Sequence, residues 1–206
     1  MSNLSQSSQT FIEQNSAVEF SCSEPWLNQL RKNGLESFSV NGLPTPNVEE
    51  WKYTSLKVLD GIGDVNNNAL DLDGVDLGWL PADLETHRLV FVNGRFDKDL
   101  SAIGQLGEGI KVLSLSEALS AEAALIKPYL GQISSVEDFP VLALNTAFIE
   151  DGLVVLIENV KLDKPIEVLY VSQGDGNATH HPRNLVVAKD GSHVTILERH
   201  VGIGNG

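Results

Sequence analysis

The carboxy-terminal third of the chain constrains its fold most strongly, because short apolar segments alternate there with turn residues. Segments of this kind are residues 153–157, 166–171, 185–188 and 194–197. Their short length and their β-branched side chains are typical of strands. The spacing fits a sandwich, a jelly roll or a solenoid equally well, and Asp190-Gly191 taken alone indicates a hairpin. We therefore expect residues 151–206 to form β structure.

The middle of the chain, residues 86–150, predicts a mixture of strands and helices. A two-residue hairpin is favoured by Asn93-Gly94, which interrupts an alternating apolar segment. Two helices are expected, each ended by a glycine that can adopt a left-handed conformation. The expected elements are strands within residues 89–96 and 110–113, a helix over residues 117–130 capped by Ser116 and ended by Gly131, and a helix over residues 139–149 ended by Gly152.

The front of the chain, residues 1–85, predicts a small helical region followed by a long connector. Pro25 suits the first turn of a helix. The apolar residues behind it approach helical spacing: Trp26, Leu27, Leu30 and Phe38. Those nearer the amino terminus are too loosely spaced to predict a helix: Leu4, Phe11, Ile12, Val18 and Phe20. Residues 60–83 are rich in Gly, Asn and Asp and predict little regular structure.

A proline-rich segment inside the front region combines a helix start with large aromatic side chains. Two prolines favour an extended lead, and Asn47 is placed to cap a helix with Glu50 in a capping box. Trp51 and Tyr53 supply apolar area that needs a partner surface. We therefore expect a helix here that docks the front region onto the rest of the chain through these two rings.

The charge and the composition exclude several classes of partner. The 206 residues carry a formal net charge of -14, and the pI is near 4.6. Because phosphate binding needs clustered Lys and Arg, we expect neither a nucleic acid nor a membrane surface as a partner. The first residues contain no apolar leader and no basic cluster, and Cys22 is the single cysteine. A reducing, cytoplasmic location is the expectation.

One group of histidines gives an alternative function. The imidazoles of His180, His181, His193 and His200, with Asp175 nearby, have the chemistry that zinc or iron needs. On a closed, cupin-like β-barrel they would make a metal-dependent enzyme. Their spacing matches no compact ligand motif, however, so we expect surface or structural side chains instead.

Other patterns in the chain predict no chemistry. Residues 71–82 imitate a calcium loop but carry Val75 and Ala82 at ligand positions. Residues 61–64 lack the third glycine of a dinucleotide loop, and Cys22 has no recognisable base nearby. We therefore expect no catalytic residue, no cofactor-binding residue and no metal ligand in this chain.

Several segments, in order along the chain, resemble one protein family. The segment Glu50-Trp51-Lys52-Tyr53 follows a proline-rich lead, as in the amino-terminal region of that family, and is a structural motif there. Later segments with the same resemblance are residues 89–96, 144–148 with Asp151-Gly152, 181–187 and 195–200. Together they are similar to the SufB/SufD family of iron-sulfur cluster assembly proteins, and within it to the SufD branch.

The resemblance implies a fold. Among the β alternatives it favours the solenoid, so the expected fold class is α+β: a small helical amino-terminal region, a mixed α/β middle, and the first coils of a truncated β-helix. Family members are longer than this chain, which therefore looks like an amino-terminal portion. A stack of coils cut early exposes backbone groups and apolar side chains, and we expect self-association at that end.

The resemblance also implies partners. Family members of this branch are non-catalytic scaffold subunits that act in a complex with SufB and the ATPase SufC, and the full complex handles the iron-sulfur cluster. The SufC contact lies in a carboxy-terminal helical domain that this chain does not include. We therefore expect no cofactor bound by this portion and no SufC binding by it.

Overall fold

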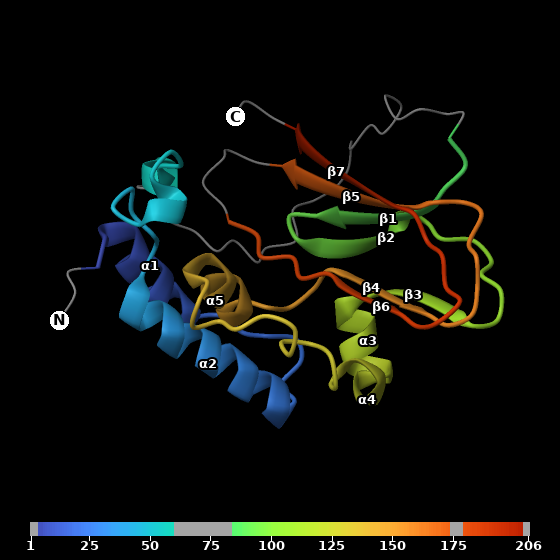
Figure 1. Ribbon diagram of the computed structural model, residues 1–206, viewed down its shortest axis with the longest axis horizontal. Coiled ribbons are helices and arrows are strands. Elements are labelled where there is room, and N and C mark those ends of the chain that lie inside the picture. Colours follow the sequence, from blue (N-terminus) through green and yellow to red (C-terminus); the bar gives the residue numbers. More distant parts are fainter. Residues whose placement is uncertain (1–3, 60–83, 174–178, 204–206) are drawn as a thin grey trace.

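The computed structural model describes residues 4–59, 84–173 and 179–203, which form a helical part beside two β-sheets (Figure 1). The helices are α1 (Gln6–Asn15), α2 (Pro25–Asn41), α3 (Leu115–Ala121), α4 (Ala123–Ile126) and α5 (Pro140–Ala147), with short 3-10 helices η1 (Glu49–Trp51) and η2 (Leu56–Leu59). The strands are β1 (His87–Val92), β2 (Arg95–Ala102), β3 (Ile110–Ser114), β4 (Leu153–Ile157), β5 (Ile166–Gln173), β6 (Leu185–Ala188) and β7 (Ile196–Ile203). The fold is mixed α+β, as expected.

The helical part is built around a close crossing of α2 and α5. At Gly34 of α2, a Cβ atom would lie 2.8 Å from both the Ala143 carbonyl oxygen and the Ala147 nitrogen of α5, so this approach requires glycine. Pro25 begins α2, as predicted, and Gly42 at φ 63° follows its last turn. The buried side chains around the crossing are Phe11, Phe38, Leu43, Ala143, Leu144, Ala147 and Phe148.

The spacing of apolar residues did not predict helix α1. Ser5 caps it by accepting a hydrogen bond from the Ser8 nitrogen at 3.2 Å, and Phe11 is only 2% exposed. The Phe11 ring meets Phe38 of α2 edge-on, with ring centroids 6.5 Å apart. Polar contacts hold α1 as well, because Ser8 Oγ accepts from the Leu43 nitrogen at 2.9 Å and Asn15 Nδ2 donates to the Ala147 carbonyl at 2.9 Å.

The strands form two sheets that face each other across one apolar core (Figure 1). Their orders are β2-β1-β5-β7 and β3-β4-β6. Side chains from both sheets fill the core between them: Leu89, Phe91, Val112, Leu153, Val155, Ile166 and Val168. The opposite face of β3-β4-β6 packs against α2, α3 and α4 through Leu27, Leu115, Leu119 and Ile126.

The hairpin of β1 and β2 turns at Asn93-Gly94, as predicted. The φ angles are 48° for Asn93 and 79° for Gly94, and a type I′ turn needs positive φ at both positions. A register shift between Arg88 and Val90 distorts the pairing farther from the turn. β3 also lies where a strand was expected, and it pairs with β4 in antiparallel orientation.

After Gly152 the chain alternates between the two sheets. β4 pairs with β6 in parallel, with Val154 opposite Leu185, and β5 pairs with β7 in parallel, with Ile166 opposite Ile196. β6 and β7 thus each lie beside the strand two positions earlier. The predicted bounds of β4 and β6 are confirmed, whereas β7 begins and ends later than expected.

Two turn and cap predictions were wrong. Asp190-Gly191 makes no hairpin, because β6 and β7 lie in different sheets and Gly191 at φ 75° turns the chain from one sheet to the other. Ser114, not Ser116, caps the helix after β3. The Ser114 Oγ accepts from the Glu117 nitrogen at 3.1 Å, and the Glu117 carboxylate accepts from the Ser114 nitrogen at 3.0 Å. The expected single helix is also divided into α3 and α4.

Several sequence predictions fall outside the described residues. They are the connector at residues 60–83, the patterns at residues 61–64 and 71–82, and Asp175. The division of the chain into residues 1–85, 86–150 and 151–206 stays a prediction. Strands of the second and third ranges share sheets, because β1 pairs with β5 and β3 pairs with β4. Within the described part of the chain, no helix combines the length and apolar character needed to cross a bilayer.

Candidate functional site

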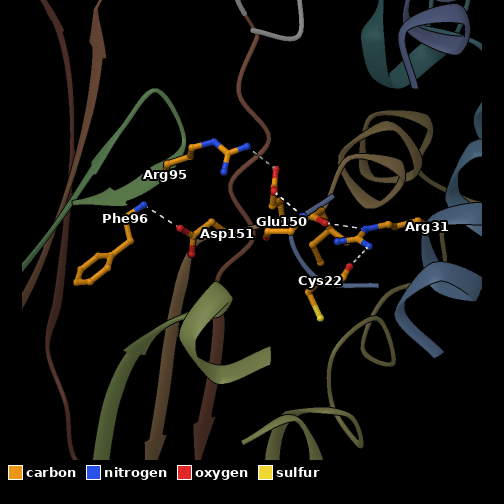
Figure 2. A network of polar contacts seen from close by, with 8 residues as sticks. Cys22, Arg31, Arg95, Phe96, Glu150 and Asp151 are labelled. Carbon is orange, nitrogen blue, oxygen red and sulfur yellow. Dashed lines mark hydrogen bonds and ion pairs between the residues drawn. The ribbon is translucent and has the colours of Figure 1, made fainter. Parts of the chain in front are cut away.

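A polar junction joins the helical part to the two sheets where α5 leads into β4 (Figure 2). Two acidic residues in this link bind the hairpin. Glu150 Oε2 accepts a hydrogen bond from Arg95 of β2 at 3.2 Å, and Asp151 Oδ2 accepts one from the Phe96 nitrogen at 2.8 Å. The polar junction consists of the side chains of Arg31, Arg95, Glu150, Asp151 and Arg183.

Asp151 is the buried acid of the junction. Only 5% of the residue is exposed, and its second oxygen, Oδ1, accepts from the Ser116 nitrogen at 3.1 Å and from the Gly152 nitrogen at 2.9 Å. Burial raises the pKa of Asp151, and the hydrogen bonds from backbone N–H groups act against that rise. One carboxylate thereby connects the hairpin, the start of α3 and the start of β4.

Gly152 is required by the backbone around the junction. Its φ of 146° lies in the region that favours glycine, and a Cβ atom there would overlap the carbonyl oxygen of Arg183. The Arg183 nitrogen donates to the Asp151 carbonyl at 2.9 Å, and the Leu115 nitrogen donates to the Gly152 carbonyl at 2.6 Å. The acidic pair is thus held by main-chain bonds on both sides.

Arg31 of α2 anchors the helical side of the junction (Figure 2). Its buried guanidinium donates to the Ile149 carbonyl at 2.9 Å and to the Cys22 carbonyl at 2.7 Å, and it lies 3.8 Å from the centroid of the Phe20 ring. Burial lowers the pKa of Arg31 to about 10, while Glu150 acts in the opposite direction. The group therefore stays charged at neutral pH. Cys22 contributes its carbonyl here, and the passive role of its half-buried thiol stays a prediction.

Arg183 brings together two of the segments that carry the family resemblance. Its Nε donates to Asn145 Oδ1 at 2.7 Å, and its Nη2 donates to Thr146 Oγ1 at 2.7 Å. In return, Asn145 Nδ2 donates to the Pro182 carbonyl at 3.0 Å. Burial lowers the pKa of Arg183. Residues 144–148 and 181–187 therefore recognise each other through polar contacts.

The first two histidines of the candidate metal group lie in the loop before β6. The His181 ring stacks on Phe148 with centroids 4.7 Å apart and meets Phe11 edge-on at 6.4 Å. Burial, with a smaller effect from His180, lowers the pKa of His181 to about 4. His180 lies beside Gly94 of the hairpin turn, and burial lowers its pKa as well. His181 is therefore a neutral packing group between α1 and the end of α5.

The other two histidines lie elsewhere. His193 is in the turn before β7, where its backbone nitrogen donates to the Val160 carbonyl at 2.8 Å. The His200 ring on β7 stacks on Tyr170 at 5.0 Å, and its Nε2 lies 2.7 Å from Glu198. Among the described residues, no three His, Cys, Asp or Glu side chains form a group that could hold a metal ion. The strands of residues 84–173 and 179–203 form two separate sheets, so the closed barrel of the cupin-like alternative was wrong.

The segment Glu50-Trp51-Lys52-Tyr53 is not the docking helix that we expected. Only Glu50 and Trp51 of this segment belong to η1, a single 3-10 turn that begins after Val48. No side chain caps this turn. Tyr53 is 92% exposed, with the Lys52 Nζ 5.6 Å from its ring centroid, and Trp51 is half-buried. The capping box and the docking of Tyr53 were therefore wrong. Apolar contacts with the helical core come instead from Leu56 and Leu59 of η2.

The charged groups of the junction bind one another, the backbone or neighbouring polar side chains, so the arrangement positions segments of the fold. Sequence reasoning missed this site. The available indication was an acidic pair, Glu150-Asp151, directly before a glycine and a continuous apolar strand, a place where carboxylates must be buried and satisfied. Nothing local identified the three arginines as their neighbours.

Comparisons with known proteins agree on one family. A family model described as SufBD protein N-terminal region matches residues 1–168. An iron-sulfur cluster assembly SufBD family protein of Synechocystis sp. is 34% identical over 167 residues, which cover 78% of this chain and 36% of that relative. Another, from Arabidopsis thaliana, is 34% identical over 91 residues, covering 44% of this chain and 19% of the relative. The chain thus spans only a part of the length of the relatives it matches.

Proposed function

Since the chain belongs to the SufBD family of iron-sulfur cluster assembly proteins, we propose that it acts as a non-catalytic scaffold portion of the machinery that builds these clusters. The observation that carries the proposal is the family match over residues 1–168. The polar junction supports a scaffold role, because its charged groups are used to fix segments of the fold against one another. In this proposal the chain itself binds no cofactor, and the iron-sulfur cluster is handled by the full complex.

The proposed partners are SufB and SufC, with this chain as part of a SufD-like subunit. The ATPase activity then belongs to SufC, and the contact with SufC lies in a region of the full-length protein beyond this chain. The location proposed for the complex is the cytoplasm, which the single cysteine of the chain supports. The acidic composition supports proteins, rather than nucleic acids or anionic membranes, as the partners.

The proposed core of the full-length protein is a β-helix whose first coils are β4 to β7. The parallel pairing of β4 with β6 and of β5 with β7 supports this, because a solenoid places each strand beside its equivalent in the preceding coil. A side-chain row supports it too: Phe91 of β1, Tyr170 of β5 and His200 of β7 stack in succession, with centroids 5.2 Å and 5.0 Å apart. In an extended stack, the next coil would continue this row.

The open edges of β6 and β7 are the proposed site of self-association by this chain. Each is the last strand of its sheet, so each has backbone N–H and C=O groups on one side without a strand partner among the described residues. Analytical ultracentrifugation over a range of concentrations tests this. The expected result is a mass that rises with concentration, and a constant monomer mass would contradict the proposal.

A genetic experiment tests the scaffold function. Cells that lack the gene for the full-length protein should show lowered activity of iron-sulfur enzymes, and the full-length protein should restore it. This chain alone should restore nothing and should retain no SufC in a pull-down, whereas the full-length protein retains it. Unchanged iron-sulfur enzyme activity in the deletion strain would overturn the function, and a stoichiometric complex of SufC with this chain would overturn the assignment of the SufC contact.

A further inference from the structure

A small cavity lies beside the polar junction, between parts of the chain that are far apart in sequence. Its volume is about 20 Å³. The lining comes from the hairpin turn at residues 93–95, from Phe148, Glu150 and Asp151 at the end of α5, and from residues 179–181. Apolar side chains of the link between α1 and α2 complete the wall. The cavity therefore touches both the helical part and the first sheet.

Two buried polar atoms in the lining residues are unpaired. Among the described residues, neither His181 Nε2 nor Thr179 Oγ1 has a hydrogen-bond partner, although both atoms are out of contact with solvent. Their side chains are two positions apart in a segment outside helices and strands, while His180 between them packs beside Gly94. A buried polar group without a partner is costly, so the native protein is expected to satisfy both atoms.

We propose that this cavity binds one ordered water molecule that hydrogen-bonds to both His181 Nε2 and Thr179 Oγ1. The volume fits this ligand, because a cavity of roughly 10–15 Å³ or more holds one water. The chemistry fits as well, since a hydroxyl both donates and accepts and can complement a water in either orientation. A neutral imidazole nitrogen accepts or donates according to its tautomer, and water serves either case.

The charged groups around the cavity do not favour a cation in its place. Glu150 is paired with Arg95, and both oxygens of Asp151 accept from backbone N–H groups. The carboxylates that line the cavity are thus already engaged. The bound water then acts as a bridge inside the loop at residues 179–181, and it holds the His181 ring in the orientation that stacks on Phe148.

The test is a crystal structure of the wild-type chain, at a resolution that orders buried waters, together with ¹⁵N NMR of the histidine rings. One water within hydrogen-bond distance of both atoms is expected. Thr179→Val, which keeps the shape and removes the hydroxyl, should lose the water and shift the His181 Nε2 resonance. Thr54→Val, at an exposed threonine, is the matched control and should change neither.

Three outcomes would overturn the proposal. They are a wild-type cavity without solvent density, a wild-type His181 Nε2 bonded to a protein atom, and a Thr179→Val protein whose water and His181 resonance are unchanged. If Thr179→Val does not fold, the wild-type density still decides, because it reports the water directly.

Discussion

At the scale of single residues, the two carboxylates that are buried in the described part of the chain, Asp151 and Glu167, are satisfied in different ways. Asp151 accepts from backbone N–H groups, whereas Glu167 of β5 lies between arginines of the neighbouring strands. Arg88 Nε donates to Glu167 Oε2 at 2.7 Å, and Arg199 Nε lies 2.9 Å from Oε1 without hydrogen-bond alignment. Thr86 Oγ1 also donates to Oε2 at 3.0 Å. Glu167 therefore ties β1, β5 and β7 together.

Removing this carboxylate should be strongly destabilising. Glu167→Ala leaves two partly buried guanidinium groups without their partner, and breaking a buried ion pair from one side costs about 3 to 5 kcal/mol. Urea unfolding of the variant and the wild type measures the difference. The matched control is Glu158→Ala, because Glu158 forms an exposed pair with Lys189 and should cost less than about 1 kcal/mol. Equal losses in the two variants would contradict the role given to Glu167.

His181 should make the fold sensitive to acid. Its pKa is lowered by burial from 6.5 to about 4 in the folded protein, so between these values the unfolded chain binds more protons. Stability is then lost as the pH falls below about 6.5, and the loss between pH 7 and pH 5 is about 2 kcal/mol from this group. His181→Phe keeps an aromatic ring and should remove that share of the pH dependence.

The measurement is the free energy of unfolding at several pH values for His181→Phe and the wild type. His193→Phe is the control, because the His193 side chain is exposed. A pH dependence that is identical in the wild type and in His181→Phe would contradict the assignment.

At the scale of elements, the predictions that were confirmed depend only on residues that are close together in the sequence. The Asn93-Gly94 turn, the start of α2 at Pro25 and the apolar runs of β4 and β6 needed no knowledge of the rest of the fold. The failures involve distant partners. α1 depends on burial of Phe11 against α2, and the Asp190-Gly191 turn serves two different sheets.

The polar junction could not be predicted from the sequence for the same reason. Arg31 and the Ile149 carbonyl are 118 positions apart in sequence, and Arg95 and Glu150 are 55 positions apart. A buried acid can be suspected from an acidic pair before an apolar strand, but its partners follow only from the packing of α2 and the hairpin around it. The separation of the four histidines likewise follows from the placement of the sheets.

The corrected cap of α3 can be tested by mutation. Ser114→Ala should cost about 1 kcal/mol, because the hydroxyl that accepts from the Glu117 nitrogen is lost in a buried position. Ser116→Ala should cost less, since the bond from the Ser116 backbone nitrogen to Asp151 survives and the change removes the contact of the Ser116 hydroxyl with Ser114 Oγ at 3.1 Å. Thermal unfolding of both variants gives the comparison. A larger loss for Ser116→Ala would restore the original capping prediction.

Tyr53, the exposed aromatic residue that follows η1, leads to a different expectation. Tyr53→Ala should change the free energy of unfolding by less than about 0.5 kcal/mol, because the ring is exposed and little packing is lost. Phe38→Ala, within the helical core, is the comparison and should cost about 3 to 5 kcal/mol. Chemical denaturation of both variants decides, and a Tyr53→Ala loss near that of Phe38→Ala would mean that the ring is buried in solution.

At the scale of the whole molecule, the two ends of the stacked sheets differ. The end formed by β2 pairs in antiparallel orientation, has a register shift and carries Asp97, Lys98 and Asp99, which are features that discourage further strand pairing. The end formed by β6 and β7 presents parallel strands, and Val186 there is 40% exposed. Association is therefore expected at one end, against the repulsion of a net charge of -14.

The proposed self-association should depend on salt. Raising the ionic strength from 0.01 M to 0.15 M shortens the screening length from about 30 Å to about 8 Å, so repulsion weakens and the average mass should rise. Val186→Lys places a charge on the edge strand and should suppress the rise. Val58→Lys, at an exposed valine of η2, is the matched control. Sedimentation velocity measures both, and equal behaviour of the two variants would argue against pairing through β6.

The parallel pairing of β1 with β5 determines when this protein can complete its first sheet during synthesis. Val90 of β1 pairs with Leu169 of β5, and a ribosome that adds 5 to 20 residues per second delivers β5 about 4 to 16 s after β1. During that interval only β2 can protect β1, and one row of backbone groups on an apolar strand stays available to other chains. The tight turn at Asn93-Gly94 lets β2 pair with β1 as soon as both strands are synthesised. It thereby covers one edge of β1 in the nascent chain.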